Sequence, residues 1–214
     1  MWASAEILGT PARSTAPIIP RVTTQPGTLR DLTLRLIDAL DEAGDDVEGH
    51  ADVLIARTRD ILRLPALDKV VANPAWSAVP ADGAAAGWLY QDGDVRITRG
   101  TMPAGFTLPP HNHGAWNIFG VYRGAVKYTS YRRVDDRDRS FHADLTVAED
   151  RIMTDGDVTV LPPPPHDVHT VTGLAETTTT LLVARGRFAE VREHYLVDEH
   201  CYVLRPGDAR GYTR

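Results

Sequence analysis

Between residues 28 and 44, apolar residues recur every three or four positions, as they do on one face of a helix. Thr28 stands at the start of this run and Asp31 follows three residues later, which is the spacing of a capping box. Gly44 can end the helix. A second helix is predicted over residues 50–64, where leucine and isoleucine again recur at helical spacing.

From about residue 88 onward, the pattern changes to short runs rich in Val, Ile, Thr and Tyr that are separated by Gly, Pro and Asp. Such runs are typical of β-strands joined by turns. Several short strands with glycine turns predict a mainly β sandwich or barrel. Near the C-terminus, residues 190–195 can form a helix and residues 202–204 an extended segment. The candidate strands are Val95–Met102, Asn117–Tyr122, Ala125–Tyr131, Asp157–Leu161, Thr170–Thr172 and Thr177–Ala184.

We expect one domain, because 214 residues suffice for a single unit with a substantial core. Residues 1–25, which carry several Pro, Ser and Thr, are expected to form an irregular arm. Residues 26–87 then form the helical part of the same domain. Residues 88–214 form the β-barrel with a C-terminal extension.

Charge and composition exclude several classes of function. The net charge of -6 leaves no basic surplus to neutralise phosphates, so we expect no general nucleic-acid binding. No apolar run approaches the ~20 residues of a membrane-spanning helix, and the N-terminus lacks the pattern of a signal peptide. The single cysteine, Cys201, allows no intrachain disulfide. This favours a reduced, cytoplasmic protein.

Two of the eight histidines, His111 and His113, are separated by one residue. In a strand, residues two apart point to the same face, so these imidazoles can converge on a metal ion. Neutral imidazole binds Fe, Zn, Cu and Ni. We favour His169 as the third ligand because it heads a strand of alternating apolar residues, and His166 is the competing choice. Solvated side chains are expected for His142, His194 and His200.

The residues around these histidines follow a recurring spacing. Asn117 and Gly124 follow the His111 and His113 pair, and a second set lies downstream. This arrangement resembles the two-part signature of the cupin superfamily, with Asn117 at the position of a glutamate and Gly173 at that of an asparagine. The resemblance implies a cupin double-stranded β-helix, a jelly-roll barrel, with the N-terminal α-helices packed on it, and it allows a homodimer. The matching positions are Gly105, His111, His113 and Gly124, then Gly156, Pro162 and His169.

A narrower similarity lies inside the first motif. Residues 111–116, followed by Gly120 and Gly124, resemble the first motif of thiol dioxygenases of the cysteine and 3-mercaptopropionate dioxygenase group. That resemblance implies iron(II) held by three histidines and no carboxylate. Those enzymes also carry a histidine and a tyrosine on a strand after the last ligand, whereas residues 180–186 contain neither. Their crosslinking cysteine and a clear counterpart of their carboxylate-binding arginine are missing as well.

Other arginines can replace the missing substrate contact, because guanidinium pairs with carboxylate through two parallel hydrogen bonds. Arg185 lies near the position of the family's tyrosine. Arg96 and Arg99 lie on the strand before the first motif. For each arginine, a solvated charge at a strand edge is the alternative interpretation.

Uncharged residues near the motif can complete a pocket. Trp116, Tyr122 and Tyr128 can line it, although aromatic residues in a β-barrel are more often plain core. Asn117 can reach the metal through its amide oxygen or hydrogen-bond a bound ligand. The candidate catalytic residues are therefore Arg185, Asn117 and Tyr122, and the candidate substrate-binding residues are Arg96, Arg99, Arg185 and Trp116.

Together these patterns predict a non-haem iron(II)-dependent dioxygenase that acts on a small thiol, either cysteine-like or a mercapto acid, with O2. Ni, Zn, Mn and Cu stay open as alternative metals, since imidazole suits most of them. One alternative is a cupin metalloenzyme with a non-thiol substrate, such as a different dioxygenase, an isomerase or a lyase. The other is a non-catalytic cupin that binds a metal or a small ligand.

Overall fold

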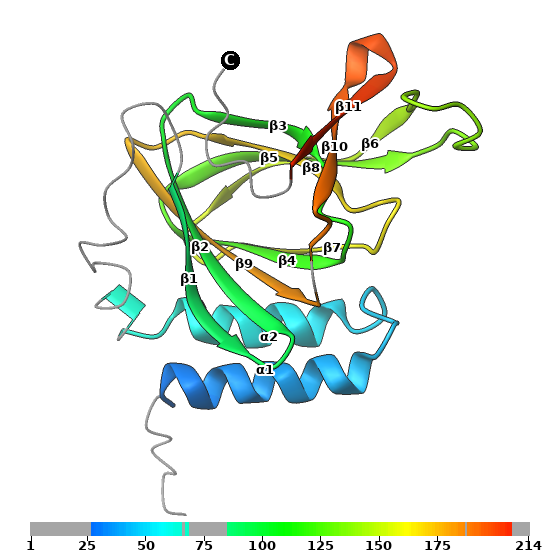
Figure 1. Ribbon diagram of the computed structural model, residues 1–214. Coiled ribbons are helices and arrows are strands. Elements are labelled where there is room, and N and C mark those ends of the chain that lie inside the picture. The colour runs from blue at the N-terminus through cyan, green and yellow to red at the C-terminus, as the bar shows by residue number, and fades with distance from the viewer. Residues whose placement is uncertain (1–26, 66, 69–84, 187, 207–214) are drawn as a thin grey trace, which may run out of the picture.

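The computed structural model describes residues 27–206 except 66, 69–84 and 187 (Figure 1). The expected arm over residues 1–25 lies outside these ranges. Two helices, α1 (Leu29–Ala43) and α2 (Ala51–Leu62), precede the strands. The strands are β1 (Ala85–Asp92), β2 (Val95–Pro103), β3 (Thr107–His111), β4 (Asn117–Arg123), β5 (Ala125–Arg133), β6 (Leu145–Thr154), β7 (Val158–Leu161), β8 (Val168–Gly173), β9 (Thr177–Arg185), β10 (Val191–Leu196) and β11 (Cys201–Pro206).

Both helices begin and end close to where the sequence predicts. The capping box of α1 is formed, because the Asp31 amide donates to Thr28 Oγ1 (3.2 Å) and the Thr28 amide donates to Asp31 Oδ2 (2.9 Å). Gly44 follows α1 with a φ of 55°, a left-handed value that glycine adopts at little cost. Neither helix, among the residues described, is long and apolar enough to cross a membrane.

The strands form two antiparallel sheets that face each other (Figure 1). The order is β1-β2-β9-β4-β7 in the first sheet and β11-β10-β3-β8-β5-β6 in the second. Successive strands from β2 onward pass repeatedly between the two sheets, as in a double-stranded β-helix. The two helices cover the outer face of the first sheet. The predicted fold, a mainly β jelly-roll barrel with N-terminal helices packed on it, is confirmed.

Alternation along β4 shows how the sequence fills these layers. Ile118 and Tyr122 belong to the apolar cluster between the helices and the first sheet. Phe119 and Val121 belong to a second cluster, which lies between the two sheets and forms the barrel interior. Successive residues of a strand point to opposite faces. The position of a residue along its strand therefore decides whether its side chain faces the helices or the barrel interior.

The C-terminal segment corrects one expectation. Residues 190–195 form strand β10 and not a helix, and β10 pairs with β11 in an antiparallel hairpin. Tertiary pairing overrides local propensity here, since β10 also pairs with β3 through His194 and His111. The expected extended segment at residues 202–204 lies within β11.

The sequence pattern missed strands β1, β3 and β6. Prolines occupy the centre of β3, at Pro109 and Pro110, where they interrupt its pairing with β8. β6 is the edge strand of the second sheet, and the polar run Glu149–Arg151 in its middle breaks any apolar alternation. His111 is the last residue of β3 and His113 lies beyond it, so the two histidines do not share a strand as expected.

Candidate metal centre

Three buried imidazoles converge on the inner side of the second sheet. His111 ends β3 and pairs across the ladder with His169 of β8. His113 follows where the chain leaves β3. The ring centroid of His111 lies 4.8 Å from the ring centroid of His113 and 4.8 Å from that of His169. Nitrogen atoms from all three rings lie within 4.8 Å of one another, which makes them a group that could hold a metal ion.

The surroundings of these rings fit metal ligation. His111 Nδ1 lies 2.8 Å from the carbonyl oxygen of Pro109, which can only accept, so the proton is on Nδ1 and the Nε2 lone pair is available. Within the described residues, neither ring nitrogen of His113 has a hydrogen-bond partner. Buried polar atoms normally have partners, so an ion between these rings would account for the orphaned nitrogens.

Burial sets the protonation of the three rings. The pKa of His111 is lowered to about 4, chiefly by desolvation and less by the charges of Arg192 and His194, while the Pro109 hydrogen bond opposes the shift. Desolvation also holds the pKa of His113 and of His169 well below 6.5. All three imidazoles are therefore neutral at pH 7, which is the form that binds a metal.

A buried carboxylate fixes the loop that carries His113. Asp167 Oδ2 accepts hydrogen bonds from the backbone amides of His113 (2.9 Å) and Gly114 (2.7 Å). Burial raises the pKa of Asp167, and these amide donors oppose that shift. Gly114 has a φ of 72°, and a Cβ there would lie 2.7 Å from Cβ of Ala189. The sequence gives no signal for Asp167 beyond its place two residues before His169.

Asn117 is placed on the barrel interior, as its candidate role requires. It is fully buried and shares the inner face of β4 with Phe119, whose ring lies 6.2 Å from that of His169. Asn117 Nδ2 donates to the Ala115 carbonyl (3.4 Å), while Oδ1 has no hydrogen-bond partner in the described part of the chain. A free amide oxygen thus remains in the interior to meet a bound ligand.

Tyr128 lies beside the same histidine. Its ring on β5 is 5.9 Å from that of His169 and nearly parallel to it, and its side chain is almost completely buried. Burial raises the pKa of its phenol far above the usual value, so Tyr128 is protonated at neutral pH. The expectation that Tyr128 is core is met, since it packs in the barrel interior. It also places a hydroxyl group in the interior of the barrel.

One of the candidate arginines shares the interior. Arg96 of β2 stands opposite Ala184 of β9, which in turn stands opposite Asn117 of β4. Residues that pair directly across an antiparallel ladder lie on the same face, so Arg96 and Asn117 both face the barrel interior. Arg96 therefore keeps its place among the candidate substrate-binding residues.

The other candidates lie on the helix side of the first sheet. Arg185 pairs with Asp41 of α1 (2.5 Å) and with Asp94 (3.0 Å). Arg99 shares its face of β2 with Ile97 of the helix-side cluster and donates to Thr101.

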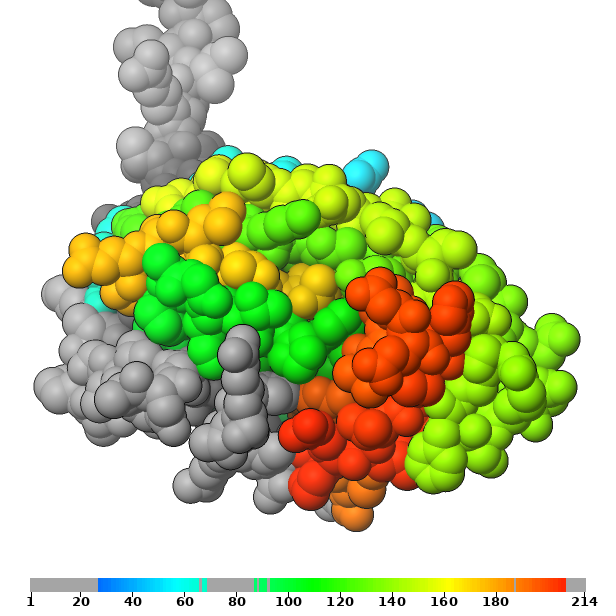
Figure 2. Space-filling view, turned by 90° about the horizontal axis from the view of Figure 1, so that it is seen from above, coloured from blue at the N-terminus to red at the C-terminus, as the bar shows by residue number. Residues whose placement is uncertain are grey.

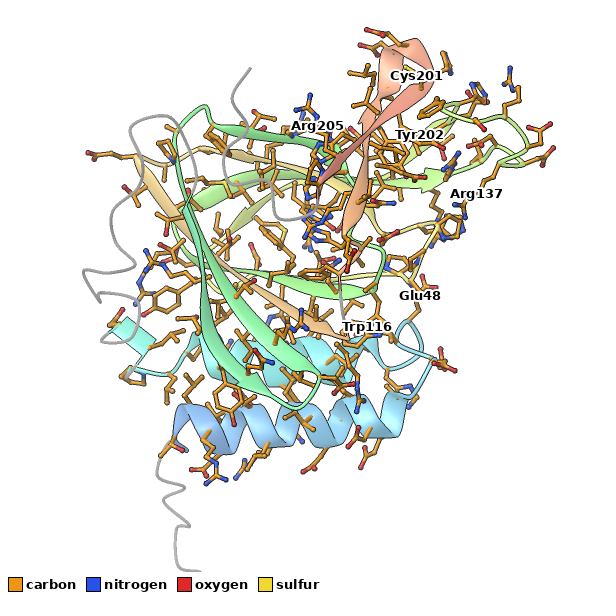
Figure 3. All side chains as sticks on the ribbon, in the orientation of Figure 1. Glu48, Trp116, Arg137, Cys201, Tyr202 and Arg205 are labelled. Carbon is orange, nitrogen blue, oxygen red and sulfur yellow. The ribbon has the colours of Figure 1, made fainter. Side chains whose placement is uncertain are left out.

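The two aromatic candidates, Tyr122 and Trp116, also lie on the helix side of the first sheet. Tyr122 donates to Asp68, and Trp116 packs against the helix-side cluster, near the helices in Figure 3. The structure thus does not bring Arg185, Arg99, Tyr122 or Trp116 to the three histidines. For Arg185, Arg99 and Tyr122 the physical reason is strand parity, which turns their side chains away from the barrel interior. Trp116 precedes β4 and packs on the helix-side cluster.

His194 was expected to be solvated, and this was wrong. It is 5% exposed, and its ring stacks on that of His111 at 5.7 Å. Burial lowers its pKa to about 4, with smaller contributions from the charges of Arg205 and Arg192. His166 is not part of the converging group. His142 and His200 flank Asp144 instead, at 3.1 and 2.7 Å.

No protein-family model matches the chain, and no curated protein does. Among solved structures, a cupin superfamily protein from Desulfitobacterium hafniense is similar over 51% of this chain and 83% of its own, at 15% identity and a TM-score of 0.38. A Klebsiella pneumoniae protein with a double-stranded β-helix domain is similar over 59% of this chain and 89% of its own, at 14% identity and a TM-score of 0.42. The DMSP lyase DddQ from Ruegeria pomeroyi is similar over 53% and 54%, at 20% identity and a TM-score of 0.37. Likeness at this level carries no argument about function, and the double-stranded β-helix of this chain rests on its own strand order.

Proposed function

We propose that this chain is an iron(II)-dependent dioxygenase of the cupin type that oxidises a small thiol with O2. The observation that carries the proposal is the convergence of three buried, neutral imidazoles, with no carboxylate in the converging group of the described residues. An all-imidazole set leaves the 2+ charge of the metal uncompensated, which favours an anionic ligand such as a thiolate. The net reaction is RSH + O2 → RSO2H, in which sulfur is oxidised and both oxygen atoms are transferred to it.

His111, His113 and His169 would hold the iron. When bound, iron(II) would supply open coordination positions for a substrate and O2 and would lower the pKa of a thiol. Asn117 offers its free amide oxygen to a ligand in the interior. Phe119, Tyr128 and the rest of the inner apolar cluster would exclude water from the reacting groups.

Two residues from outside β9 supply the groups whose absence weakened the resemblance to thiol dioxygenases. Residues 180–186 contain neither histidine nor tyrosine, but His194 of β10 contacts the ring of His111 and Tyr128 of β5 contacts that of His169. An imidazole and a phenol ring therefore lie next to the ligands. Their task in this proposal is to hold substrate and O2 through hydrogen bonds.

The same two residues support a second candidate, a cupin metalloenzyme that moves protons on a non-thiol substrate, such as a lyase or an isomerase. Such a reaction needs a base and an acid near the metal. His194 and Tyr128 stand at two of the three ligands and can fill these roles. The two candidates differ in whether O2 is consumed.

Metal content tests the centre itself. The protein is purified without oxygen, and its iron, zinc, nickel, manganese and copper are measured, before and after reconstitution with iron(II). Near-stoichiometric metal is expected for the wild type and for His166→Ala, and loss of metal with retained fold for His113→Ala. Full metal occupancy in His113→Ala would overturn the assignment of the ligands.

Oxygen uptake tests the chemistry. Iron-loaded protein is assayed with cysteine, cysteamine and 3-mercaptopropionate, and the product is identified by mass. Thiol-dependent uptake with formation of the sulfinate is the expected result. A loaded centre that consumes no O2 with any of these thiols would contradict the proposal and favour the lyase or isomerase candidate.

A further inference from the structure

We infer that Glu149 of β6 takes up the proton that a substrate loses on binding at the three histidines, and that it releases this proton to solvent through a cavity at the edge of the barrel. The inference rests on the proposed function, in which a thiol RSH binds as RS⁻. The step is RSH + Glu149–COO⁻ → RS⁻ + Glu149–COOH, and the carboxyl group then gives its proton to water. Glu149 was not a candidate from the sequence.

One row of cross-strand partners connects Glu149 to the histidines. Across the second sheet, His194 of β10 stands opposite His111 of β3, which stands opposite His169 of β8. His169 also stands opposite Ser130 of β5, and Ser130 stands opposite Glu149. Direct partners on an antiparallel ladder lie on the same face of the sheet. All five side chains therefore share the face that carries the proposed metal ligands.

The row reaches solvent at the β6 end and not at the hairpin end. The β10–β11 hairpin that carries His194 lies directly beside β3 when the molecule is seen from above (Figure 2). His194 is 5% exposed, and its partner on β11 is the apolar Val203. The side chain of Glu149 is 36% exposed, because β6 is the edge strand of the sheet. Glu149 is therefore the member of the row that can exchange a proton with water.

A β-bulge and a cavity lie beside Glu149. The register between β5 and β6 shifts so that Ala148 has no partner on β5, and such bulges are common next to active sites. A cavity of about 180 Å³ is lined here by Ser130, Ala148 and Glu149, and by Val160 of β7. The cavity therefore lies where the edge strands of the two sheets meet. It has room for several water molecules, since each occupies about 30 Å³ in the liquid.

The contacts of Glu149 hold its carboxylate at the boundary between the barrel interior and the cavity. Oε2 accepts a hydrogen bond from Thr159 Oγ1 of β7 (3.4 Å), and Oε1 lies 2.7 Å from Arg151 Nε. Two further charged groups line the cavity, Arg132 and Glu48, and they pair with each other at 3.3 Å. Glu48, which is labelled in Figure 3, comes from the loop between α1 and α2. The charges around Glu149 are thus balanced in pairs.

His166 gives the cavity a second group that can carry a proton. It lines the cavity, and its Nδ1 is buried without a hydrogen-bond partner in the described part of the chain. Buried polar atoms normally have partners, so water or a small acid in the cavity would supply one. Histidine is a common proton carrier in proteins. The residue that competed for the place of third ligand thus stands on the path from Glu149 to solvent.

Ser130 links the histidines to Glu149. Glu149 lies two strands from His169, about 10 Å at the usual strand spacing, so it acts through a group between them. The hydroxyl of Ser130 can donate and accept at once, and it shares a hydrogen bond with the phenol of Tyr128, whose ring lies against that of His169. Asp167 is the rival carboxylate, but it is fully buried and cannot pass a proton to water directly.

The test follows proton release and not turnover. Full-length protein loaded with cobalt(II) is mixed without oxygen, in weakly buffered solution that contains a pH indicator, with 2-mercaptoethanol or acetohydroxamic acid. Both probes lose one proton on binding to a metal, and only the first is a thiol. Stopped-flow absorption gives the rates of proton release and of probe binding and dissociation. The variants are Glu149→Gln, Glu149→Asp and Ser130→Ala. Asp150→Asn is the matched control, because Asp150 is the next residue of β6, faces the other side and pairs with Lys127.

Glu149→Gln should slow binding and dissociation of both probes by at least about 10-fold, since a positioned acid or base contributes about 10²- to 10⁴-fold. The affinity should stay the same, because a proton carrier accelerates both directions equally. Glu149→Asp should keep part of the rate, and Asp150→Asn should behave as wild type. Ser130→Ala should be slow as well.

Chemical rescue separates proton transfer from a structural role. Formate is small enough for the cavity, so at constant ionic strength it should restore the rate of Glu149→Gln, but not that of Ser130→Ala, whose carboxylate is intact. Wild-type protein in formate corrects for competition at the metal. Wild-type rates in Glu149→Gln or in Ser130→Ala, or a slow Glu149→Gln that formate does not restore, would overturn the inference.

The two probes also separate this inference from the proposed function. If both probes bind and Glu149→Gln is as fast as the wild type, the thiol function stands and the role of Glu149 fails. If acetohydroxamic acid binds at a rate that depends on Glu149 but the thiol does not bind, the role of Glu149 stands and the thiol function fails. Binding of neither probe would overturn both.

Discussion

Asn112, which directly follows β3, and Glu193 of β10 are joined by three hydrogen bonds. The Asn112 amide donates to the Glu193 carbonyl (3.2 Å), the Glu193 amide donates to Asn112 Oδ1 (3.0 Å), and Asn112 Nδ2 donates to Glu193 Oε2 (3.1 Å). Asn112 lies between two of the proposed metal ligands, and Glu193 lies between Arg192 and His194. This clamp therefore fixes the hairpin relative to the metal centre.

Replacing Asn112 by Ala should weaken metal binding by about 10- to 100-fold, the usual effect of removing a group that orients ligands. The variant loses both side-chain bonds to Glu193, so the backbone between His111 and His113 is less well fixed. Competition with a metal chelator measures the affinity. Thr107→Ala is the control, because it removes one exposed hydroxyl bond to Thr172 at the other end of β3. Unchanged metal affinity in Asn112→Ala would show that the clamp does not orient the ligands.

Gly114→Ala should destabilise the fold more than Gly105→Ala. Both glycines have left-handed φ values, 72° and 78°, so alanine carries a similar backbone cost of about 1–2 kcal/mol at each. Only at position 114 would the new Cβ also collide, at 2.7 Å from Cβ of Ala189, whereas nothing lies within 4 Å at position 105. Denaturant titration gives the free energy of unfolding of both variants. The difference between the two variants measures the cost of the collision with Ala189. Equal losses in the two variants would mean that the segment at Ala189 moves aside freely.

The parts of this fold that the sequence predicted are those with local signals. The capping box at Thr28 and Asp31 and the apolar spacing after it mark α1 without any tertiary information. Strands β4 and β9 are buried along most of their length, and the sequence marks them as short runs rich in Val, Leu, Ile and Thr between turn residues. The convergence of the three histidines could be predicted because ligand chemistry restricts the residue type, even though His113 lies outside the strand that was expected to carry it.

The parts that were missed depend on register and pairing. Arg96 and Arg99 differ by three positions and therefore face opposite sides of β2, a distinction that requires knowing which side the helices cover. β10 has the sequence VREHYL, with no clear alternation, and its pairing with β3 decides its structure. The burial of His194 and the position of Arg192 follow from that pairing, so neither could be read from the chain alone.

Because of Asp135, the free energy of unfolding should decrease as the pH falls into the acid range. A hydrogen bond from Arg133, whose side chain is 2% exposed, holds the pKa of Asp135 far below its usual 3.8, and the backbone amides of Asp144 and Arg137 add to this. A carboxyl with a depressed folded pKa stabilises the fold fully above 3.8 and loses that contribution as the pH falls. Asp135→Asn should therefore be less stable at pH 7 by about 1–3 kcal/mol and should show a shallower decline between about pH 5 and 2.

Denaturant titrations across this pH range measure the effect. Asp136→Asn, at the exposed neighbouring position, is the matched control and should keep the full decline. Parallel curves for the wild type and Asp135→Asn would mean that the ion pair with Arg133 does not contribute to acid sensitivity.

Arg185→Ala should leave the metal centre and the binding of mercapto acids unchanged. Its guanidinium pairs with Asp41 and Asp94, whose side chains are both 57% exposed, on the side of the first sheet that faces the helices. Exposed ion pairs contribute about 0–1 kcal/mol, so a loss within that range is expected in the free energy of unfolding. Weaker binding of mercapto acids by Arg185→Ala, with the fold retained, would contradict this prediction. It would mean that an arginine on the helix side of the first sheet still acts on the substrate.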